Sequence, residues 1–283
     1  MDWSSSVGVV ARASPLADFE PTNAEPHDAR RPLRVAVTSA FVSSSAVSSS
    51  SSSLSSSPSS PPVAAAAAAA AAAVVFAIDD VLSAEECLAL IAVGESLGFG
   101  EAPICACGNV REDASATARV NASLRHHKRA AAMDAALCSL LLGRLRHCIP
   151  ERLADGGLLK GLNPLVRWLR YDCGDFVAVH KDGAYLAPSG ERSALTLLVY
   201  LTNEGARGGG GETAFYASWK DADARDDRAL LAPRAGRACL MPQNILHEGR
   251  KVHTQSAKYV LRTEVMYSPA PLPPGRDPAS PEG

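Results

Sequence analysis

The segment Tyr171-Asp-Cys-Gly-Asp-Phe-Val-Ala-Val-His180-Lys-Asp182 joins a short apolar run to two residue types that bind metals. Phe176 to His180 is short and rich in residues that favour strands, so we expect it to be a strand. Residues two apart on a strand face the same side. His180 and Asp182 can therefore offer an imidazole nitrogen and a carboxylate oxygen to one point.

The chain around this segment has the pattern of a β-rich domain. Further short segments rich in Val, Leu, Tyr and Thr, separated by Gly, Pro, Asn and Asp, are Leu165–Tyr171, Leu195–Leu201, Glu212–Tyr216, Arg237–Met241 and Lys258–Tyr267. Many short strands with such punctuation indicate a β-sandwich, barrel or jelly roll. Trp168 alternates with Val166 and Arg170, and we expect it in the core.

Upstream of these strands the pattern favours helices. Val74–Ile78 reads as a strand, and the capping-box pattern Ser83-Ala-Glu-Glu86 then begins a helix that ends near Gly98. Apolar residues at helical spacing over Met133–Cys148 predict a second helix, which ends before Pro150. Helices followed by strands predict an α+β chain with N-terminal helices packed on a β core.

Low-complexity composition marks the two ends of the chain. Ser43–Ser60 holds 14 serines in 18 residues, and Ala64–Ala73 is unbroken alanine, so neither can bury enough apolar area to offset its ordering entropy. We therefore predict a disordered region over residues 1–73, a folded domain over 74–268 with its β core at about 164–268, and a Pro-rich tail over 269–283.

Charge and composition exclude several classes of protein. The net charge of −2 over 283 residues argues against a nucleic-acid partner. The sequence contains no strongly apolar run of about 18 residues, so we expect no membrane span. The 7 cysteines are scattered and the first residues lack a secretory signal, which favours the cytoplasm or nucleus. The Arg-, Ser- and Ala-rich stretch 29–78, free of acidic residues, is also the composition of an organelle transit peptide.

A third metal ligand is available far along the sequence. His247 lies in Asn244-Ile-Leu-His247-Glu-Gly249, near the last predicted strands. Two histidines and one carboxylate leave open positions on a metal, which is the arrangement of non-haem Fe(II) oxygenases. Because Zn²⁺ accepts the same ligands, ligand type alone leaves the metal open.

The order and spacing of these motifs resemble the prolyl 4-hydroxylase-like 2-oxoglutarate/Fe(II)-dependent dioxygenases. The matching features are Tyr-x-x-Gly-x-x-Val-x-x-His-x-Asp over 171–182, Gly210-Gly211-Glu-Thr-Ala-Phe215, His247 with Lys258 eleven residues later, and the opening Ile78-Asp-Asp-Val-Leu-Ser83-Ala-Glu-Glu-Cys87. The resemblance extends from about Val75 to Tyr267.

This resemblance implies a fold, a reaction and a set of site residues. It implies a double-stranded β-helix (jelly-roll) core and an oxidoreductase that uses Fe(II), 2-oxoglutarate and O₂, with ascorbate, to hydroxylate a C–H bond while releasing succinate and CO₂. His180, Asp182 and His247 would bind the iron. Lys258 would bind the far carboxylate of 2-oxoglutarate, with Tyr171 and Tyr200 helping to hold the co-substrate.

Two features of the sequence depart from the family's pattern. The usual interval from the distal histidine to the basic residue is one shorter than that from His247 to Lys258, which implies a one-residue bulge or slip. Arg262 lies four residues after Lys258 on the same strand face, and its guanidinium could grip a carboxylate with two hydrogen bonds. Arg262 is thus a rival for the co-substrate. Val177 replaces a common aromatic residue, which affects packing.

The sequence leaves the substrate open. A prolyl residue of a protein or peptide is the first hypothesis, a lysyl residue or a small molecule the second, and a non-catalytic jelly-roll metal-binding module the third. The charged run His126-His127-Lys128-Arg129 is expected to be solvated, and Lys220–Arg228 to be an exposed loop. Nothing in the sequence indicates the oligomeric state.

Overall fold

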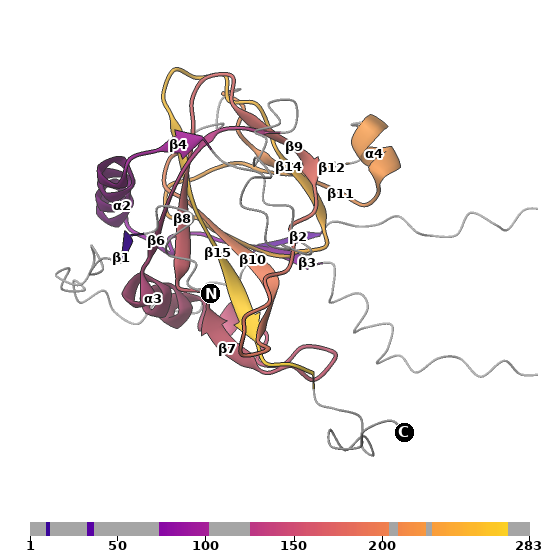
Figure 1. Ribbon diagram of the computed structural model, residues 1–283. Helices are drawn as coiled ribbons and strands as arrows, with labels where there is room; N and C mark the ends of the chain where they lie inside the picture. Colours follow the sequence, from indigo (N-terminus) through magenta and orange to yellow (C-terminus); the bar gives the residue numbers. More distant parts are fainter. Residues whose placement is uncertain are drawn as a thin grey trace, which may run out of the picture.

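The computed structural model describes residues 10–11, 33–36, 74–101, 125–203, 209–224 and 228–270 (Figure 1). Its larger sheet has the strand order β1 (Val10–Ala11), β6 (Lys128–Met133), β8 (Leu165–Tyr171), β15 (Lys258–Tyr267), β10 (Arg192–Tyr200), β13 (Ala238–Pro242), β3 (Val74–Ile78) and β2 (Leu33–Ala36). Two short strands, β4 (Gly100–Glu101) and β7 (Leu159–Leu162), pair with β6 and β15.

The smaller sheet lies against one face of the larger sheet. Its strand order is β12 (Arg228–Leu231), β11 (Thr213–Tyr216), β14 (Leu246–Gly249), β9 (Phe176–His180) and β5 (Arg125–His126). The helices α2 (Ala84–Leu97) and α3 (Ala135–Leu145) lie on the other side of the larger sheet, and α4 (Trp219–Ala224) flanks the smaller one (Figure 1). Two facing, largely antiparallel sheets with helices on one side confirm the predicted α+β jelly-roll fold.

Alternation along each strand divides the core into two layers. Trp168, Val199 and Leu261 belong to the apolar cluster between the larger sheet and the helices α2 and α3. The Trp168 indole N–H donates to the Leu90 carbonyl of α2 at 2.9 Å. The other face of the same strands carries Tyr200 and Val260, which pack between the sheets. Because residues two apart share a face, Lys258, Val260, Arg262 and Glu264 of β15 all point toward the smaller sheet.

The predicted helices form, with one shifted start. Ser83 caps α2 as predicted, since its hydroxyl accepts from Glu86 N and its backbone N–H donates to the Glu86 carboxylate at 2.8 Å. The second helix begins at Ala135 rather than Met133, because Asp134 caps it through Leu137 N at 2.8 Å while Met133 still pairs with Leu165 in the sheet. The 3₁₀ turn η2 (Arg146–Cys148) completes this helix.

Two segments within the predicted disordered region are strands. β1 pairs in parallel with β6, and β2 pairs antiparallel with β3, so residues 10–11 and 33–36 cover the two edges of the larger sheet. The prediction of disorder over 1–73 is corrected at these positions, because unpaired backbone groups at a sheet edge offer partners that composition does not reveal. The rest of 1–73, and residues 271–283, lie outside the described residues.

The β core also begins earlier than the predicted residue 164. β3 and β6 are integral to the larger sheet and pair with β13 and β8. The domain limits at 73 and 268 stay predictions. None of the described helices combines the length and apolar character needed to cross a bilayer.

Gly236 provides a test of this packing. It has φ 81°, its carbonyl accepts from Val81 N at 2.8 Å, and an added Cβ would lie 2.1 Å from the Leu82 carbonyl oxygen. We expect Gly236→Ala to lower the free energy of unfolding by about 3 kcal/mol, from left-handed backbone strain and overpacking together. Urea unfolding measures this value.

Gly143 is the matched control. It lies inside α3, and an added Cβ there meets nothing within 4 Å. Gly143→Ala should raise stability by up to about 1 kcal/mol, because alanine has the higher helix propensity. Equal midpoints for the two variants would contradict the packing described here.

Candidate metal centre

The two histidines face each other across the smaller sheet. His180, the last residue of β9, pairs directly with His247 of β14, and their rings lie 4.3 Å apart between centroids. Phe215 of β11 pairs with His247 on its other side, with the rings 6.3 Å apart. Strand pairing therefore brings together two residues that are distant in the sequence.

A β-bulge on β9 turns His180 inward. His247 pairs with His180 and Gly249 with Val177, so two residues of β9 oppose the single residue Glu248. Val177 packs between the sheets, whereas Val179 packs on the outer side of the smaller sheet. Regular alternation from Val177 would have pointed His180 outward, so the extra residue places its ring on the inner side. This bulge lies on β9, outside the interval from His247 to Lys258, so the irregularity expected in that interval stays a prediction.

Asp182 completes the cluster just beyond the end of β9. Its carboxylate oxygens lie 3.6 Å from His180 Nε2 and 3.9 Å from His247 Nε2, and its side chain is 9% exposed. Thr196 of β10 donates its hydroxyl to Asp182 Oδ2 at 2.6 Å. Burial raises the pKa of Asp182, but Arg262 and the two histidines lower it by more, so this pKa is well below its ordinary value. Asp182 is therefore a carboxylate.

The imidazole nitrogens are arranged to receive a metal ion. His180 Nδ1 lies 2.9 Å from the Ala178 carbonyl, and His247 Nδ1 lies 3.1 Å from the Ile245 carbonyl. Each carbonyl needs an N–H donor, which assigns the proton to Nδ1 and leaves the Nε2 lone pair toward Asp182. Burial, together with His180, lowers the pKa of His247 to about 4, although Asp182 opposes the shift. His247 is therefore neutral near pH 7.

The geometry of these three residues fits a bound metal. One ligand atom from each of His180, Asp182 and His247 lies within 4.8 Å of the others. Two neutral imidazoles and one carboxylate on one side of an ion form the set used by Fe(II) oxygenases, and they leave the opposite positions open.

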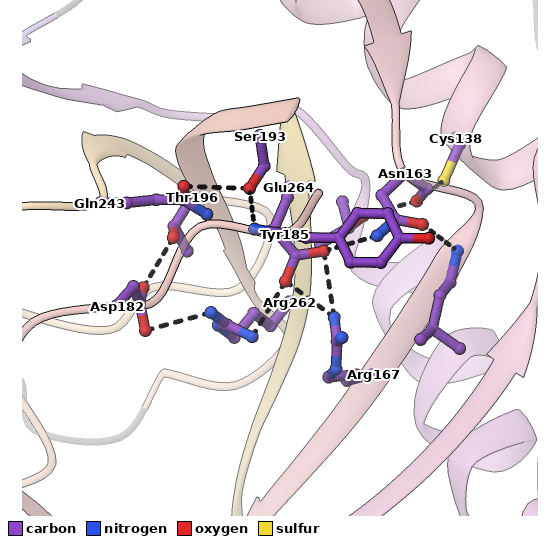
Figure 2. Close-up of polar contacts among 12 residues, drawn as sticks. Cys138, Asn163, Arg167, Asp182, Tyr185, Ser193, Thr196, Gln243, Arg262 and Glu264 are labelled. Carbon is purple, nitrogen blue, oxygen red and sulfur yellow. Dashed lines mark hydrogen bonds and ion pairs between the residues drawn. The ribbon is translucent and has the colours of Figure 1, made fainter. Parts of the chain in front are cut away.

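Arg262 lies between two carboxylates, as Figure 2 shows. Its Nη2 is 3.0 Å from Asp182 Oδ1, and its Nη1 donates to Glu264 Oε1 at 3.1 Å. Glu264 is 3% exposed and also accepts from Arg167 at 2.8 Å and from Asn163 at 3.0 Å. This chain of charge-assisted bonds connects the Asp182 carboxylate to the larger sheet.

Lys258 lies in a different environment from Arg262 on the same strand face. It is buried and pairs across the sheet with Tyr171 of β8. Its ammonium lies 4.8 Å from the Tyr171 ring centroid and 5.6 Å from that of Tyr200, and it donates to the Gly211 carbonyl at 2.6 Å. Among the described residues no carboxylate forms an ion pair with it, and burial lowers its pKa to about 8 although Glu212 opposes this.

The structure thus brings together all seven residues singled out in the sequence, in two neighbouring groups. It also adds residues that sequence reasoning missed, namely Thr196, Glu264 and His127. Thr196 and Glu264 carry no motif, because their roles depend on which strands pair. His127 was expected to be solvated, but its ring stacks on Tyr171 with 4.8 Å between centroids. No sequence motif marks this residue, because its burial depends on the pairing of its neighbours with β9 and β8.

The β-rich part of the chain matches a known family of proteins. Residues 166–263 match the sequence profile of the 2OG-Fe(II) oxygenase superfamily. This segment includes all three candidate metal ligands, Lys258 and Arg262. No curated protein matches the chain.

Solved structures with a similar fold include several oxygenases. A Pseudomonas putida prolyl-4-hydroxylase is 19% identical, covering 72% of this chain and 99% of its own, with a TM-score of 0.45. A Trichoplax adhaerens prolyl hydroxylase, in complex with a hypoxia inducible factor oxygen degradation domain peptide fragment, is 17% identical, covering 68% and 82%, with a TM-score of 0.49. HygX from Streptomyces hygroscopicus, with nickel, 2-oxoglutarate and hygromycin B bound, is 13% identical, covering 70% and 84%, with a TM-score of 0.45. Similarity at this level does not extend to the substrate.

Removal of the carboxylate should abolish metal retention. We expect Asp182→Ala to weaken binding of Mn²⁺, an inert substitute for Fe(II), by more than ~100-fold, because the loss of a supporting residue alone typically costs ~10–100-fold. Calorimetric titration of the metal-free protein measures this affinity. Asp223→Ala, which removes an exposed carboxylate on α4, is the control and should bind Mn²⁺ normally. Normal binding by Asp182→Ala would remove Asp182 from the site.

Proposed function

We propose, from the match of residues 166–263 to the 2OG-Fe(II) oxygenase superfamily, that this protein hydroxylates a prolyl residue of a protein or peptide. The reaction would consume 2-oxoglutarate and O₂, and would yield succinate, CO₂ and the hydroxylated residue. One oxygen atom enters succinate and the other enters the C–H bond. Ascorbate is proposed as the accessory reductant on the family resemblance.

The observation that carries this proposal is a cluster of three potential metal ligands next to a buried cation, Lys258, that forms no ion pair among the described residues. His180, Asp182 and His247 would hold Fe(II), which supplies the activation of O₂. Lys258 would supply the positive charge for the far carboxylate of 2-oxoglutarate. 2-Oxoglutarate is a dianion, so one of its ends could bind the metal while its far carboxylate pairs with Lys258.

The environment of Lys258 supports this role. A buried ammonium is costly unless it is paired, and Lys258 has one carbonyl and two aromatic rings around it. A carboxylate entering beside Tyr171 and Tyr200 would complete its pairing. The Tyr200 hydroxyl is already engaged with Thr213 at 2.6 Å, so we assign Tyr200 to the wall of this pocket.

The contacts of Arg262 favour a different role. Its guanidinium is shared between Asp182 and Glu264, two carboxylates of this chain. Binding 2-oxoglutarate would require Arg262 to give up an ion pair with one of these two buried carboxylates, which is costly in a core. We therefore propose that Arg262 positions Asp182 and that Lys258 binds the co-substrate.

The prolyl target rests on the ordered motif set of the prolyl 4-hydroxylase-like dioxygenases, from the opening around Ser83 to Lys258. The test is succinate release by the full chain supplied with Fe(II), 2-oxoglutarate, O₂ and ascorbate, with and without proline-rich peptides. We expect succinate to rise with peptide, the peptide to gain one oxygen at proline, and both signals to vanish in His180→Ala.

Other outcomes of this assay would redirect the proposal. Slow succinate release that no prolyl peptide stimulates would keep the chemistry and overturn the prolyl target in favour of a lysyl residue or a small molecule. Absence of succinate from iron-loaded protein would support the non-catalytic metal-binding module.

A matched pair of substitutions separates the two cations. Lys258→Met should weaken 2-oxoglutarate binding to the Mn²⁺-loaded protein by ~10–100-fold, because a charge-assisted hydrogen bond is lost. Arg262→Met should instead weaken Mn²⁺ binding by ~10–100-fold and leave 2-oxoglutarate affinity at saturating metal nearly unchanged. The reverse pattern would transfer the co-substrate role to Arg262.

The same titrations predict a pH dependence. The ammonium form binds a carboxylate, so affinity for 2-oxoglutarate is complete below the Lys258 pKa of about 8 and falls as pH rises through it. Burial raises the pKa of Tyr171 and Tyr200 and lowers that of His127 to about 3, so these neighbours do not titrate in this range. The fall should be absent in Lys258→Met.

A further inference from the structure

His127 occupies the corner where the chain passes from the smaller sheet to the larger one. Arg125–His126 pair with β9, the strand of His180, and the next strand, β6, pairs with β8, the strand of Tyr171. His127 is the single residue between these two strands. Its ring stacks on Tyr171 with 4.8 Å between centroids and 21° between planes. The backbone therefore fixes this imidazole beside Tyr171, which pairs with Lys258 on its other side.

The His127 ring carries a buried nitrogen without a partner. Among the described residues, the buried side-chain nitrogens and oxygens that lack a hydrogen bond are His127 Nδ1 and Gln243 Nε2. A buried polar atom left in this state loses its hydrogen bonds to water without compensation, so such atoms call for an explanation. His126, its neighbour, differs in this respect, because its Nδ1 meets Asp175 Oδ1 at 2.5 Å and its side chain is 64% exposed.

The charges around His127 favour an anion. Burial, and to a smaller extent the positive charges of Arg125, Arg129 and Lys258, lower the pKa of His127 to about 3, so the ring is neutral and has one N–H to donate. Lys258 and His180 are the two ends of the space assigned above to 2-oxoglutarate. A prolyl side chain is uncharged and would gain nothing from these cations, whereas a dicarboxylate would.

We propose that His127 is a co-substrate-binding residue, whose Nδ1–H donates a hydrogen bond to a carboxylate oxygen of bound 2-oxoglutarate. The inference rests on the proposed function and deepens it. Lys258 supplies charge, Tyr171 supplies a flat wall, and His127 supplies a directional donor held by stacking on that wall. Binding of 2-oxoglutarate would thus require a hydrogen-bond donor at the Nδ1 position, and an aromatic ring alone would not replace it.

The test uses the full chain loaded with Mn²⁺, and calorimetry to measure 2-oxoglutarate binding without turnover. His127→Phe keeps a ring to stack on Tyr171 and removes Nδ1, and it should weaken 2-oxoglutarate binding by ~10-fold. His127→Asn can place an amide N–H near the Nδ1 position and should stay within ~3-fold of the original affinity. Mn²⁺ affinity should be unchanged in both. His127→Leu, which adds less volume than phenylalanine, replaces the Phe variant if that variant does not fold.

His147→Phe is the matched control, because it makes the same change at an exposed histidine of η2 and should leave both affinities unaltered. Full 2-oxoglutarate affinity in His127→Phe, combined with its loss in Lys258→Met, would overturn the role of His127 alone. Parallel losses of Mn²⁺ and 2-oxoglutarate affinity, or equal losses in the Phe and Asn variants, would also overturn it. Failure of the unaltered protein to bind 2-oxoglutarate would overturn the proposed function itself.

Discussion

The burial of the Asp182 carboxylate is the constraint around which the inner faces of both sheets are organised. A charge in this position is costly unless partners surround it. The two histidines of the smaller sheet, and Thr196 and Arg262 of the larger one, supply those partners. The network of charged partners extends further along the larger sheet, because Arg262 contacts Glu264 and Glu264 contacts Arg167. The proposed role of Asp182 as a metal ligand would therefore explain why a polar cluster, and not an apolar one, fills this part of the core.

Arg262 and Lys258, two cations on the same face of β15, have different partners for their charges. Arg262 has two carboxylates of its own chain, so its charge is neutralised within the protein. Lys258, four residues away on β15, has a carbonyl and aromatic rings but no ion pair among the described residues, and its pKa falls to about 8. This contrast separates a positioning charge from a binding charge. Residue type alone favoured the arginine, because a guanidinium is the better carboxylate ligand.

Local sequence predicted those features whose causes are local. β8, β9 and β15 have the predicted limits, and the Ser83 capping box forms, because alternation and capping act within a few residues. β6 was missed because Lys128–Met133 is alanine-rich and lacks β-branched residues, so only its pairing with β8 makes it a strand. The partners of Asp182 and the burial of His127 could not be predicted either, since strand order alone brings them to the site.

The bulge between Val177 and His180 shows why the His-x-Asp motif is insufficient by itself. With regular pairing, His180 would share the outer side of the smaller sheet, where Val179 packs near Tyr216 and Leu246. The extra residue reverses the alternation, and His180 then faces His247 on the inner side. Such a mismatch belongs to the pair of strands and is invisible in either strand alone. The proposed metal centre thus depends on its three ligands and also on the β-bulge of β9, which points His180 toward the other two.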